Sequence, residues 1–292
     1  MSGDIPRNLA MLHAAFGSGP LFAPTDDDLI TFEGVELISG YEHASTPERF
    51  VIVKQPPHRD AFIEMCRSVR GGRLVELGIA EGGSTVLAAL AAEPSAMLAV
   101  DIEPEPLAAL EEFIAARDLG ARVHTRYGID QGDRDQLART VDEAIGTEPL
   151  DLVLDDASHA LDPTRASFEV LFPRLAPGGL YAIEDWNADH AFREAMIEYY
   201  SAASTRERAE LARRLMRDEA TSPAPAGPPG RRPLLDLAVE LTLARARDAE
   251  DAIAEVVVNR YWLMVRRGPA TLDGTTFRLA DVAHDHFGYL SS

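Results

Sequence analysis

The sequence predicts an α/β fold built on a doubly wound parallel sheet. Between residues 58 and 183, short apolar runs alternate with segments of helical periodicity, which is typical of βαβ units. The first of these runs ends in the glycine-rich turn GIAEGG, where a ligand can approach bare backbone. Hydrophobic residues form 46% of the 292 residues, which suffices for the core of one large domain with additions.

Residues 1–57 are expected to form an N-terminal extension to this domain. Within the extension, an alternating apolar pattern over residues 30–38 predicts a hairpin strand, and Pro56 and Pro57 stop a further short strand. A short helix over residues 11–16 and an acidic turn at Asp26 to Asp28 complete the extension.

Residues 58–292 are expected to form the main domain. A helix over 58–69 leads into a first strand over 74–77. The alternation then predicts helices over 84–92, 104–119, 133–145 and 164–175, and strands over 97–100, 121–127, 150–154 and 180–183. The turn at Pro177 to Gly179 is expected to end a helix and start the fifth strand.

The C-terminal third is expected to insert a segment and then close the sheet. Residues 190–217 are helical and charged in pattern, and residues 221–233 hold too many prolines for a helix or a central strand, so an insertion is expected at about 190–235. A helix over 234–249 and an antiparallel hairpin over 256–265 would raise the five parallel strands to a seven-stranded sheet.

Charge and cysteine content exclude several classes of partner. The net charge of −20 opposes nucleic-acid binding, and the basic cluster from Arg206 to Arg217 is interleaved with acids, as on a solvated helix face. Cys66 is the only cysteine, so no intrachain disulfide is possible, which fits a reducing compartment. Without a leader pattern or an apolar run of membrane-spanning length, we expect a cytoplasmic protein that does not contact a membrane.

The glycine-rich turn and a downstream acid predict a nucleoside cofactor. Gly78 and Gly82 free the backbone of the turn, and the helix that begins near Ser84 offers unpaired N–H groups. Asp101 ends the next strand, 23 residues after Gly78, where a carboxylate can accept both hydroxyls of a ribose. The alternative is a plain strand–turn–helix without a ligand.

Glu76 indicates which cofactor. The turn fits the dinucleotide pattern GxGxxG poorly, and a carboxylate two residues before Gly78 would repel a pyrophosphate. The same carboxylate suits S-adenosylmethionine, which carries a sulfonium and an ammonium but no phosphate. An NAD-dependent oxidoreductase is the less favoured alternative.

Acidic residues follow the fourth and fifth predicted strands. Asp155 and Asp156 end one strand and Glu184 and Asp185 end the next, at the sheet edge where open α/β sheets bind ligands. Like charges this close require protonation or a cation, and Asp156, Glu184 and Asp185 could ligate Mg²⁺. Asp155 is expected to contact the cofactor. The alternative assigns one acid to a helix cap and another to the cofactor, with the rest solvated.

His159 and the segment YGIDQGD complete the candidate site. His159 follows Asp156 by three residues and could take a proton from a substrate hydroxyl, or could simply bond within its loop. Asp130 and Gln131 are placed to bond an adenine ring, whereas Asp133 serves equally as a helix N-cap or as a ligand contact.

These motifs resemble the class I S-adenosylmethionine-dependent methyltransferases. ELGIAEGGS is similar to their first motif, VDIEP to their ribose acid, and LAPGGLYAIED to their fifth strand. DDASH, EDW and IDQGD further resemble the macrocin and mycinamicin sugar O-methyltransferases and the cephalosporin-biosynthesis methyltransferases. The resemblance covers residues 50–190 and implies a Rossmann-like sheet with Mg²⁺ on Asp156, Glu184 and Asp185, and His159 as general base.

The predicted function follows from that resemblance. It implies a Mg²⁺-dependent O-methyltransferase that acts on a hydroxyl of a small metabolite, plausibly a natural-product sugar or polyketide, and that assembles as a homo-oligomer. The N-terminal extension and the insertion, which match nothing in the pattern, would shape the acceptor pocket or the oligomer contacts. Two alternatives stay open: a metal-independent methyltransferase of nitrogen or carboxylate, and a non-catalytic binding subunit.

Overall fold

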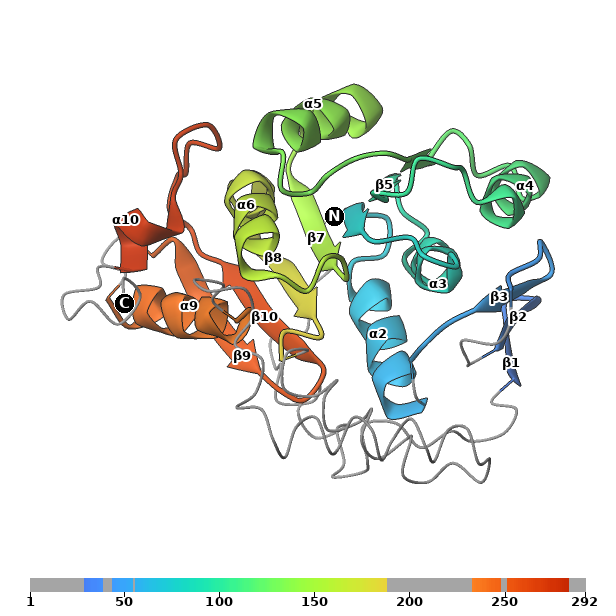
Figure 1. The fold of residues 1–292 in the computed structure, drawn as a ribbon, viewed down its shortest axis with the longest axis horizontal. Helices are drawn as coiled ribbons and strands as arrows, with labels where there is room; N and C mark the ends of the chain where they lie inside the picture. Colours follow the sequence, from blue (N-terminus) through green and yellow to red (C-terminus); the bar gives the residue numbers. More distant parts are fainter. Residues whose placement is uncertain (1–28, 39–43, 55, 188–232, 248–250, 284–292) are drawn as a thin grey trace, which may run out of the picture.

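A seven-stranded sheet forms the centre of the protein (Figure 1). The structure is a computed structural model that describes residues 29–38, 44–54, 56–187, 233–247 and 251–283. The strand order is β6-β5-β4-β7-β8-β10-β9, with β4 to β8 parallel and β10 antiparallel to both of its neighbours. The strands are β4 (Arg73–Leu77), β5 (Ala96–Val100), β6 (Val123–Arg126), β7 (Leu150–Asp155), β8 (Leu175–Glu184), β9 (Ile253–Val258) and β10 (Trp262–Arg267). The predicted doubly wound sheet and its closing hairpin are confirmed.

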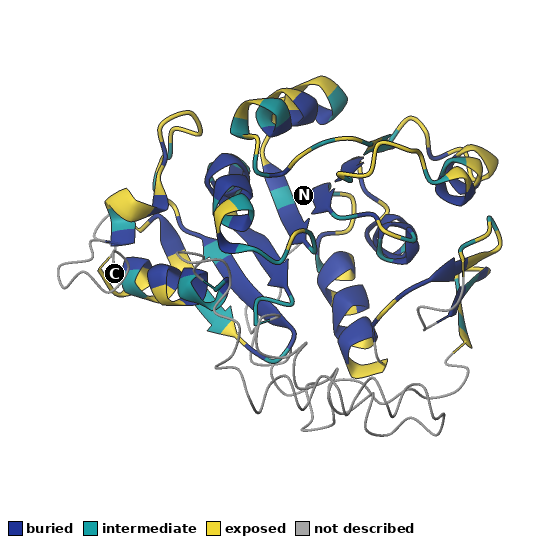
Figure 2. Cartoon of the chain, in the orientation of Figure 1, coloured by how far each residue is buried: buried dark blue, intermediate teal, exposed yellow. Residues whose placement is uncertain are grey.

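Helices cover both faces of this sheet, and most residues of the central strands are buried (Figure 2). Successive strand residues point to opposite faces, so Leu74 packs in one core and Val75 in the other. The first core lies under α2 (Pro56–Ser68), α3 (Gly83–Ala92) and α4 (Ala108–Ala116). The second lies under α5 (Arg134–Ile145), α6 (Leu161–Leu171), α9 (Leu235–Arg247) and α10 (Leu279–Ala283).

Prolines move several helix boundaries away from the predicted ones. Helix α2 begins at Pro56, because the first turn of a helix does not use its N–H groups. Helix α4 begins at Ala108 rather than at residue 104, since Pro106 disfavours a helical conformation at the residue before it. Helix α6 begins earlier than predicted and ends at Leu171, where Pro173 tightens the chain into the 3-10 turn η1 (Phe172–Arg174).

The predicted turn before the fifth parallel strand is wrong. Strand β8 already starts at Leu175 and contains Pro177, Gly178 and Gly179. Its pairing with β7 is interrupted there, because Leu150 pairs with Leu175 whereas Leu152 pairs with Leu180. The turn residues therefore form an irregularity inside a long strand.

A small three-stranded sheet precedes the main one, with β1 (Leu29–Phe32), β2 (Val35–Ile38) and β3 (Arg49–Val51) in that order. The predicted single strand over 30–38 is in fact a hairpin, which turns at Glu33 and Gly34. Both residues have positive φ, 48° and 78°, as a tight hairpin turn requires. The features predicted at 11–16, 26–28 and 190–217, and nearly all of the insertion, lie outside the described residues.

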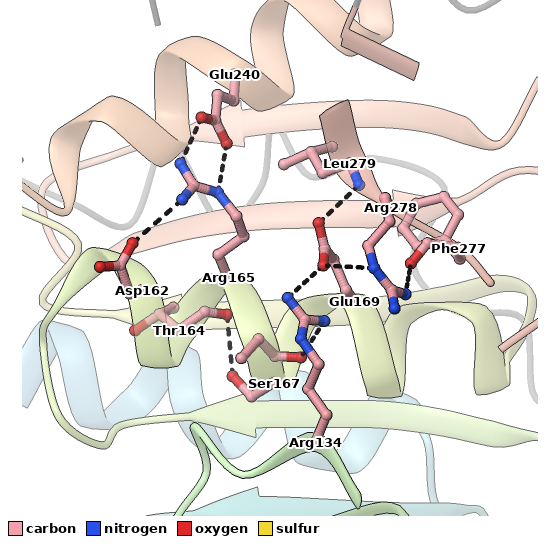
Figure 3. Close-up of polar contacts among 11 residues, drawn as sticks. Arg134, Asp162, Thr164, Arg165, Ser167, Glu169, Glu240, Phe277, Arg278 and Leu279 are labelled. Carbon is pink, nitrogen blue, oxygen red and sulfur yellow. Dashed lines mark hydrogen bonds and ion pairs between the residues drawn. The ribbon is translucent and has the colours of Figure 1, made fainter. Parts of the chain in front are cut away.

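Ion pairs join the C-terminal helices to α6 (Figure 3). The Arg165 guanidinium on α6 binds both carboxylate oxygens of Glu240 on α9, with Nε donating to Oε2 at 2.9 Å. Glu169 on α6 accepts a hydrogen bond from the backbone N–H of Leu279 at 2.8 Å and pairs with Arg134 of α5.

Among the described residues, no helix is both long enough and apolar enough to cross a membrane.

Candidate active site at the carboxyl edge of the sheet

The turn between β4 and α3 depends on its glycines. Gly78 has a φ of +95°, and a Cβ there would lie 2.4 Å from the carbonyl oxygen of Asp156. Gly82 has a φ of +77° and is the N-cap of α3. A Cβ on Gly83 would lie 2.1 Å from the carbonyl oxygen of Val51, so the absence of a side chain here lets strand β3 approach the turn. The turn is thereby packed against both β3 and the loop after β7.

Asp101, the predicted ribose acid, holds this turn in place. Its Oδ2 accepts hydrogen bonds from the backbone N–H groups of Ile79 at 2.8 Å and Ala80 at 2.9 Å. Its Oδ1 accepts one from Glu103 N at 2.9 Å. The carboxylate therefore lies at the turn, as predicted. Its neighbour Ile102, which the sequence analysis did not single out, leaves 64% of its surface exposed beside it.

Glu76 is buried at the end of β4, 1% exposed. Burial raises the pKa of its carboxyl to about 7, although hydrogen bonding to Ser84 lowers it in part. Within the described part of the chain, its Oε2 has no hydrogen-bond partner. Glu76 and Ser84, both predicted to contact the cofactor, therefore lie together next to the glycine turn.

Asp156, His159 and Asp185 form one group after β7 and β8. Each can offer a donor atom such that all three atoms lie within 4.8 Å of one another. Burial raises the pKa of Asp185 to about 7, and the negative charges of Glu184 and Asp156 add to the increase. His159 and Asp185 have positive φ values of 46° and 49°, a strained conformation that functional sites often retain.

Glu184, the third predicted metal ligand, is not part of that group. Its carboxylate forms an ion pair with Lys54, and its Oε1 lies 3.2 Å from His58 Nε2. Trp262 Nε1 donates a hydrogen bond to its Oε2 at 3.3 Å. Burial and the charge of Lys54 lower the pKa of His58 well below its usual value, so the imidazole is neutral. The carboxylate thus already has partners on both oxygens.

Lys54, which the sequence analysis did not single out, reaches the acids from the segment between β3 and α2. Its side chain is 3% exposed, and Nζ donates a hydrogen bond to Asp156 Oδ2 at 3.2 Å. Burial alone would lower its pKa, but Asp156 and Glu184 raise the pKa well above the usual value, so the amine is an ammonium. One feature of the sequence could have indicated this residue: of the 28 lysines and arginines, only Lys54 is a lysine.

Asp155 lies on the other side of the strand and does not join the acids. Its Oδ2 accepts hydrogen bonds from the hydroxyls of Tyr181 at 2.7 Å and Ser167 at 2.9 Å. The side chain is 1% exposed, and burial raises its pKa to about 6. Side chains of adjacent strand residues alternate between faces, so Asp155 is directed into the core, and its predicted contact with a cofactor is not supported by this geometry.

The segment after β6 contacts the loop that carries His159. Gln131 is buried, and its Nε2 donates a hydrogen bond to Ser158 Oγ at 2.9 Å. The exposed Asp130 accepts a hydrogen bond from Gly132 N at 2.7 Å within its own turn. Of the two roles open to Asp133, the structure shows the N-cap, with Gln136 N donating to Oδ1 at 2.9 Å.

Part of the chain is similar to known methyltransferases. Residues 75–186 match the Methyltransf_24 family model, described as "Methyltransferase domain". A segment of 64 residues is 50% identical to the 8-demethyl-8-alpha-L-rhamnosyl tetracenomycin-C 2'-O-methyltransferase of Streptomyces olivaceus. A segment of 68 residues is 47% identical to the mycinamicin VI 2''-O-methyltransferase of Micromonospora griseorubida.

These alignments cover parts of each protein. They include 22% and 23% of this chain, and the chain covers 16% of the length of each relative. A solved structure of MycE methyltransferase from the mycinamycin biosynthetic pathway, in complex with Mg, SAH and mycinamycin VI, is 23% identical with a TM-score of 0.46. That match covers 73% of this chain and 49% of MycE. Residues 75–186, which include most of the parallel part of the sheet, are therefore similar to a methyltransferase domain.

Proposed function

We propose that the protein transfers the methyl group of S-adenosylmethionine to a hydroxyl of a natural-product sugar. The observation that carries the proposal is the group formed by Asp156, His159 and Asp185, which lies next to the glycine turn at the same sheet edge. The acceptor class is inferred from the relatives, which are named as O-methyltransferases of the tetracenomycin and mycinamicin pathways.

The cofactor would lie along the glycine turn. Glu76 and Ser84 would receive its methionine end, where a buried carboxylate would be ionised by an adjacent cation. Gly78 and Gly82 allow close approach to the backbone, and Asp101 would receive the ribose beside them. Ile102 offers an exposed apolar side chain on which an adenine ring could pack.

The acids fit a divalent ion. Asp156, Glu184 and Asp185 bring three carboxylates together, and Lys54 supplies one positive charge, so two negative charges remain when all are ionised. Asp156 and Asp185 would hold the ion, because Glu184 already has partners. When bound, Mg²⁺ would lower the pKa of an acceptor hydroxyl.

His159 would act as the general base. Its imidazole would take the proton of the acceptor hydroxyl while the oxygen attacks the methyl carbon. The oxygen–carbon bond forms as the carbon–sulfur bond breaks, and the electron pair of that bond stays on sulfur. The products are the methyl ether, S-adenosylhomocysteine and a protonated His159. Alignment of the two reactants at this edge would supply much of the rate.

Substitution of His159 tests this role. His159→Ala is expected to lower kcat by about 10²- to 10⁴-fold on a glycoside acceptor, because the base is lost. S-adenosylhomocysteine should bind to the variant as it does to the wild type, because the glycine turn is unchanged. His124→Ala, on the edge strand β6, is the matched control and should retain activity. A wild-type kcat in His159→Ala would contradict this role. It would indicate that the activity of the protein does not depend on this imidazole.

Lys54 supports one alternative, a metal-independent methyltransferase, because an ammonium already bridges Asp156 and Glu184. Treatment with EDTA, followed by addition of Mg²⁺, separates the two candidates. We expect turnover to be lost with EDTA and restored by Mg²⁺. Turnover that EDTA leaves unchanged would show that the ion is not required and would favour the alternative.

A further inference from the structure

We propose that Lys54 is the built-in cation of the acidic group and that it sets both the position and the affinity of the divalent ion. The inference rests on the ion of the proposed function. Lys54 lies between Asp156 and Glu184, two of the three carboxylates that the sequence assigns to that ion.

The use of lysine at this position is selective. The chain has 28 lysines and arginines, and every one except Lys54 is an arginine. An ammonium is a compact point charge, whereas a guanidinium is a wide planar fork. The Lys54 ammonium is almost fully buried, contacts two carboxylates and lies 5.1 Å from the centre of the Phe62 ring. The surroundings therefore fit a small cation.

The backbone holds Lys54 in this position. Val51, three residues earlier, forms a β-bridge with Gly82, and the absence of a side chain on Gly83 admits its carbonyl oxygen. Ser45 fixes the same segment, because its N–H donates to Glu81 Oε2 at 2.9 Å and its Oγ donates to Glu81 O at 2.6 Å. The segment that carries Lys54 is thus joined to the glycine turn, and the ammonium is a fixed part of the site.

The ammonium divides the three acids into two sets. Glu184 contacts Lys54 and Trp262, and His58 lies beside it, whereas Asp185 groups with Asp156 and His159. Lys54 also bonds Asp156 Oδ2, so it competes with the ion for that carboxylate. Loss of the ammonium would free oxygens on Asp156 and Glu184 and remove a repulsion between two cations in a buried site. A divalent ion should then bind more tightly.

Direct measurement of Mn²⁺ binding tests the proposal without reference to activity. The full chain, treated with a chelator and then freed of it, is titrated with Mn²⁺ and the free ion is followed by electron paramagnetic resonance. Lys54→Met is expected to lower the Kd by about tenfold or more, because the competing positive charge is lost. Asp156→Asn should weaken binding in either background.

Two results of this titration would overturn the proposal. Unchanged or weaker Mn²⁺ binding in Lys54→Met, in a protein that still binds S-adenosylhomocysteine, would overturn the role of Lys54. Absence of Mn²⁺ binding from both the wild type and Lys54→Met would overturn it as well. In that case, methyl transfer in EDTA shows whether the proposed methyltransferase activity itself survives.

A second readout uses the fact that the chain has one lysine. Isotope-labelled lysine gives a single side-chain resonance for Lys54 in the full protein. Addition of Mg²⁺ is expected to shift that resonance, because the ion would share Asp156 with the ammonium. A resonance that does not respond to Mg²⁺, at concentrations that displace bound Mn²⁺ in the titration above, would contradict the proposal.

Discussion

At the residue scale, Gln131 contacts the loop that carries His159. Its Nε2 donates to Ser158 Oγ and lies within 3.5 Å of Thr164 Oγ1, while its contact with an adenine stays a prediction. Ser158 and His159 both have positive φ, 51° and 46°, which costs free energy unless neighbouring contacts fix the loop. We therefore expect Gln131 to position the imidazole of His159 through Ser158.

Substitution of Gln131 tests this positioning role. Gln131→Leu keeps the approximate volume but removes the donor, and we expect kcat to fall by about fivefold, equivalent to one hydrogen bond of about 1 kcal/mol. Binding of S-adenosylhomocysteine should be nearly unchanged. Ser158→Ala removes the acceptor of the same bond, so the double variant should lose little more than either single one. Fully additive losses would show that the two side chains act separately.

Glu76 makes the stability of the fold depend on pH. Its pKa is raised from 4.5 to about 7 by burial, so the folded state binds a proton that the unfolded state has already released in that range. The contribution of Glu76 to the free energy of unfolding is therefore highest below about pH 4.5. It falls by about 3 kcal/mol as the pH rises through 7.

The variant Glu76→Gln isolates that contribution. Because the amide does not ionise, the free energy of unfolding in urea should fall less between about pH 4.5 and pH 8 than in the wild type. Parallel curves for the two proteins over this range would contradict the raised pKa of Glu76.

Strand periodicity explains which site residues the sequence predicts. Asp156, His159 and Asp185 follow two parallel strands, so their common location at one sheet edge could be inferred. The direction of Asp155 could also have been inferred from the alternation of side chains along β7. The contacts of Lys54 and Trp262 with Glu184 could not, because they join segments 130 and 78 residues apart.

At the element scale, prolines and glycines decide how the predicted helices and strands meet. The sequence identifies each sheet strand from its apolar run, but the boundaries of α4 and α6 depend on Pro106 and Pro173. The close approach of β3 to α3 depends on Gly83. A pattern of hydrophobicity contains no information on that approach, so the contact between the N-terminal extension and the glycine turn was not predicted.

Gly83→Ala tests this contact. The added Cβ would lie 2.1 Å from Val51 O, so β3 must move, and we expect a loss of about 2 kcal/mol or more in the free energy of unfolding. Gly120→Ala is the matched control, because a Cβ there meets no atom within 4 Å. Equal thermal stability of the two variants would show that the packing of β3 on α3 is loose.

At the scale of the whole molecule, four separate segments supply the acidic group and its partners. The β3–α2 connection brings Lys54, the loop after β7 brings Asp156 and His159, the end of β8 and the residue after it bring Glu184 and Asp185, and the start of β10 brings Trp262. The order of the sheet accounts for the middle two, because β7 and β8 are neighbours. The N-terminal sheet, which covers the glycine turn, had no counterpart in the predicted fold beyond two short strands.

The central claim is that this sheet edge binds the methyl donor rather than another nucleoside cofactor. Calorimetric titration of the full chain with S-adenosylhomocysteine, and in parallel with NADH, tests it most directly, because neither titration requires the acceptor. We expect saturable binding of S-adenosylhomocysteine, weakened in Asp101→Asn, and no binding of NADH. Binding of NADH, or no binding of S-adenosylhomocysteine to the folded protein, would contradict it.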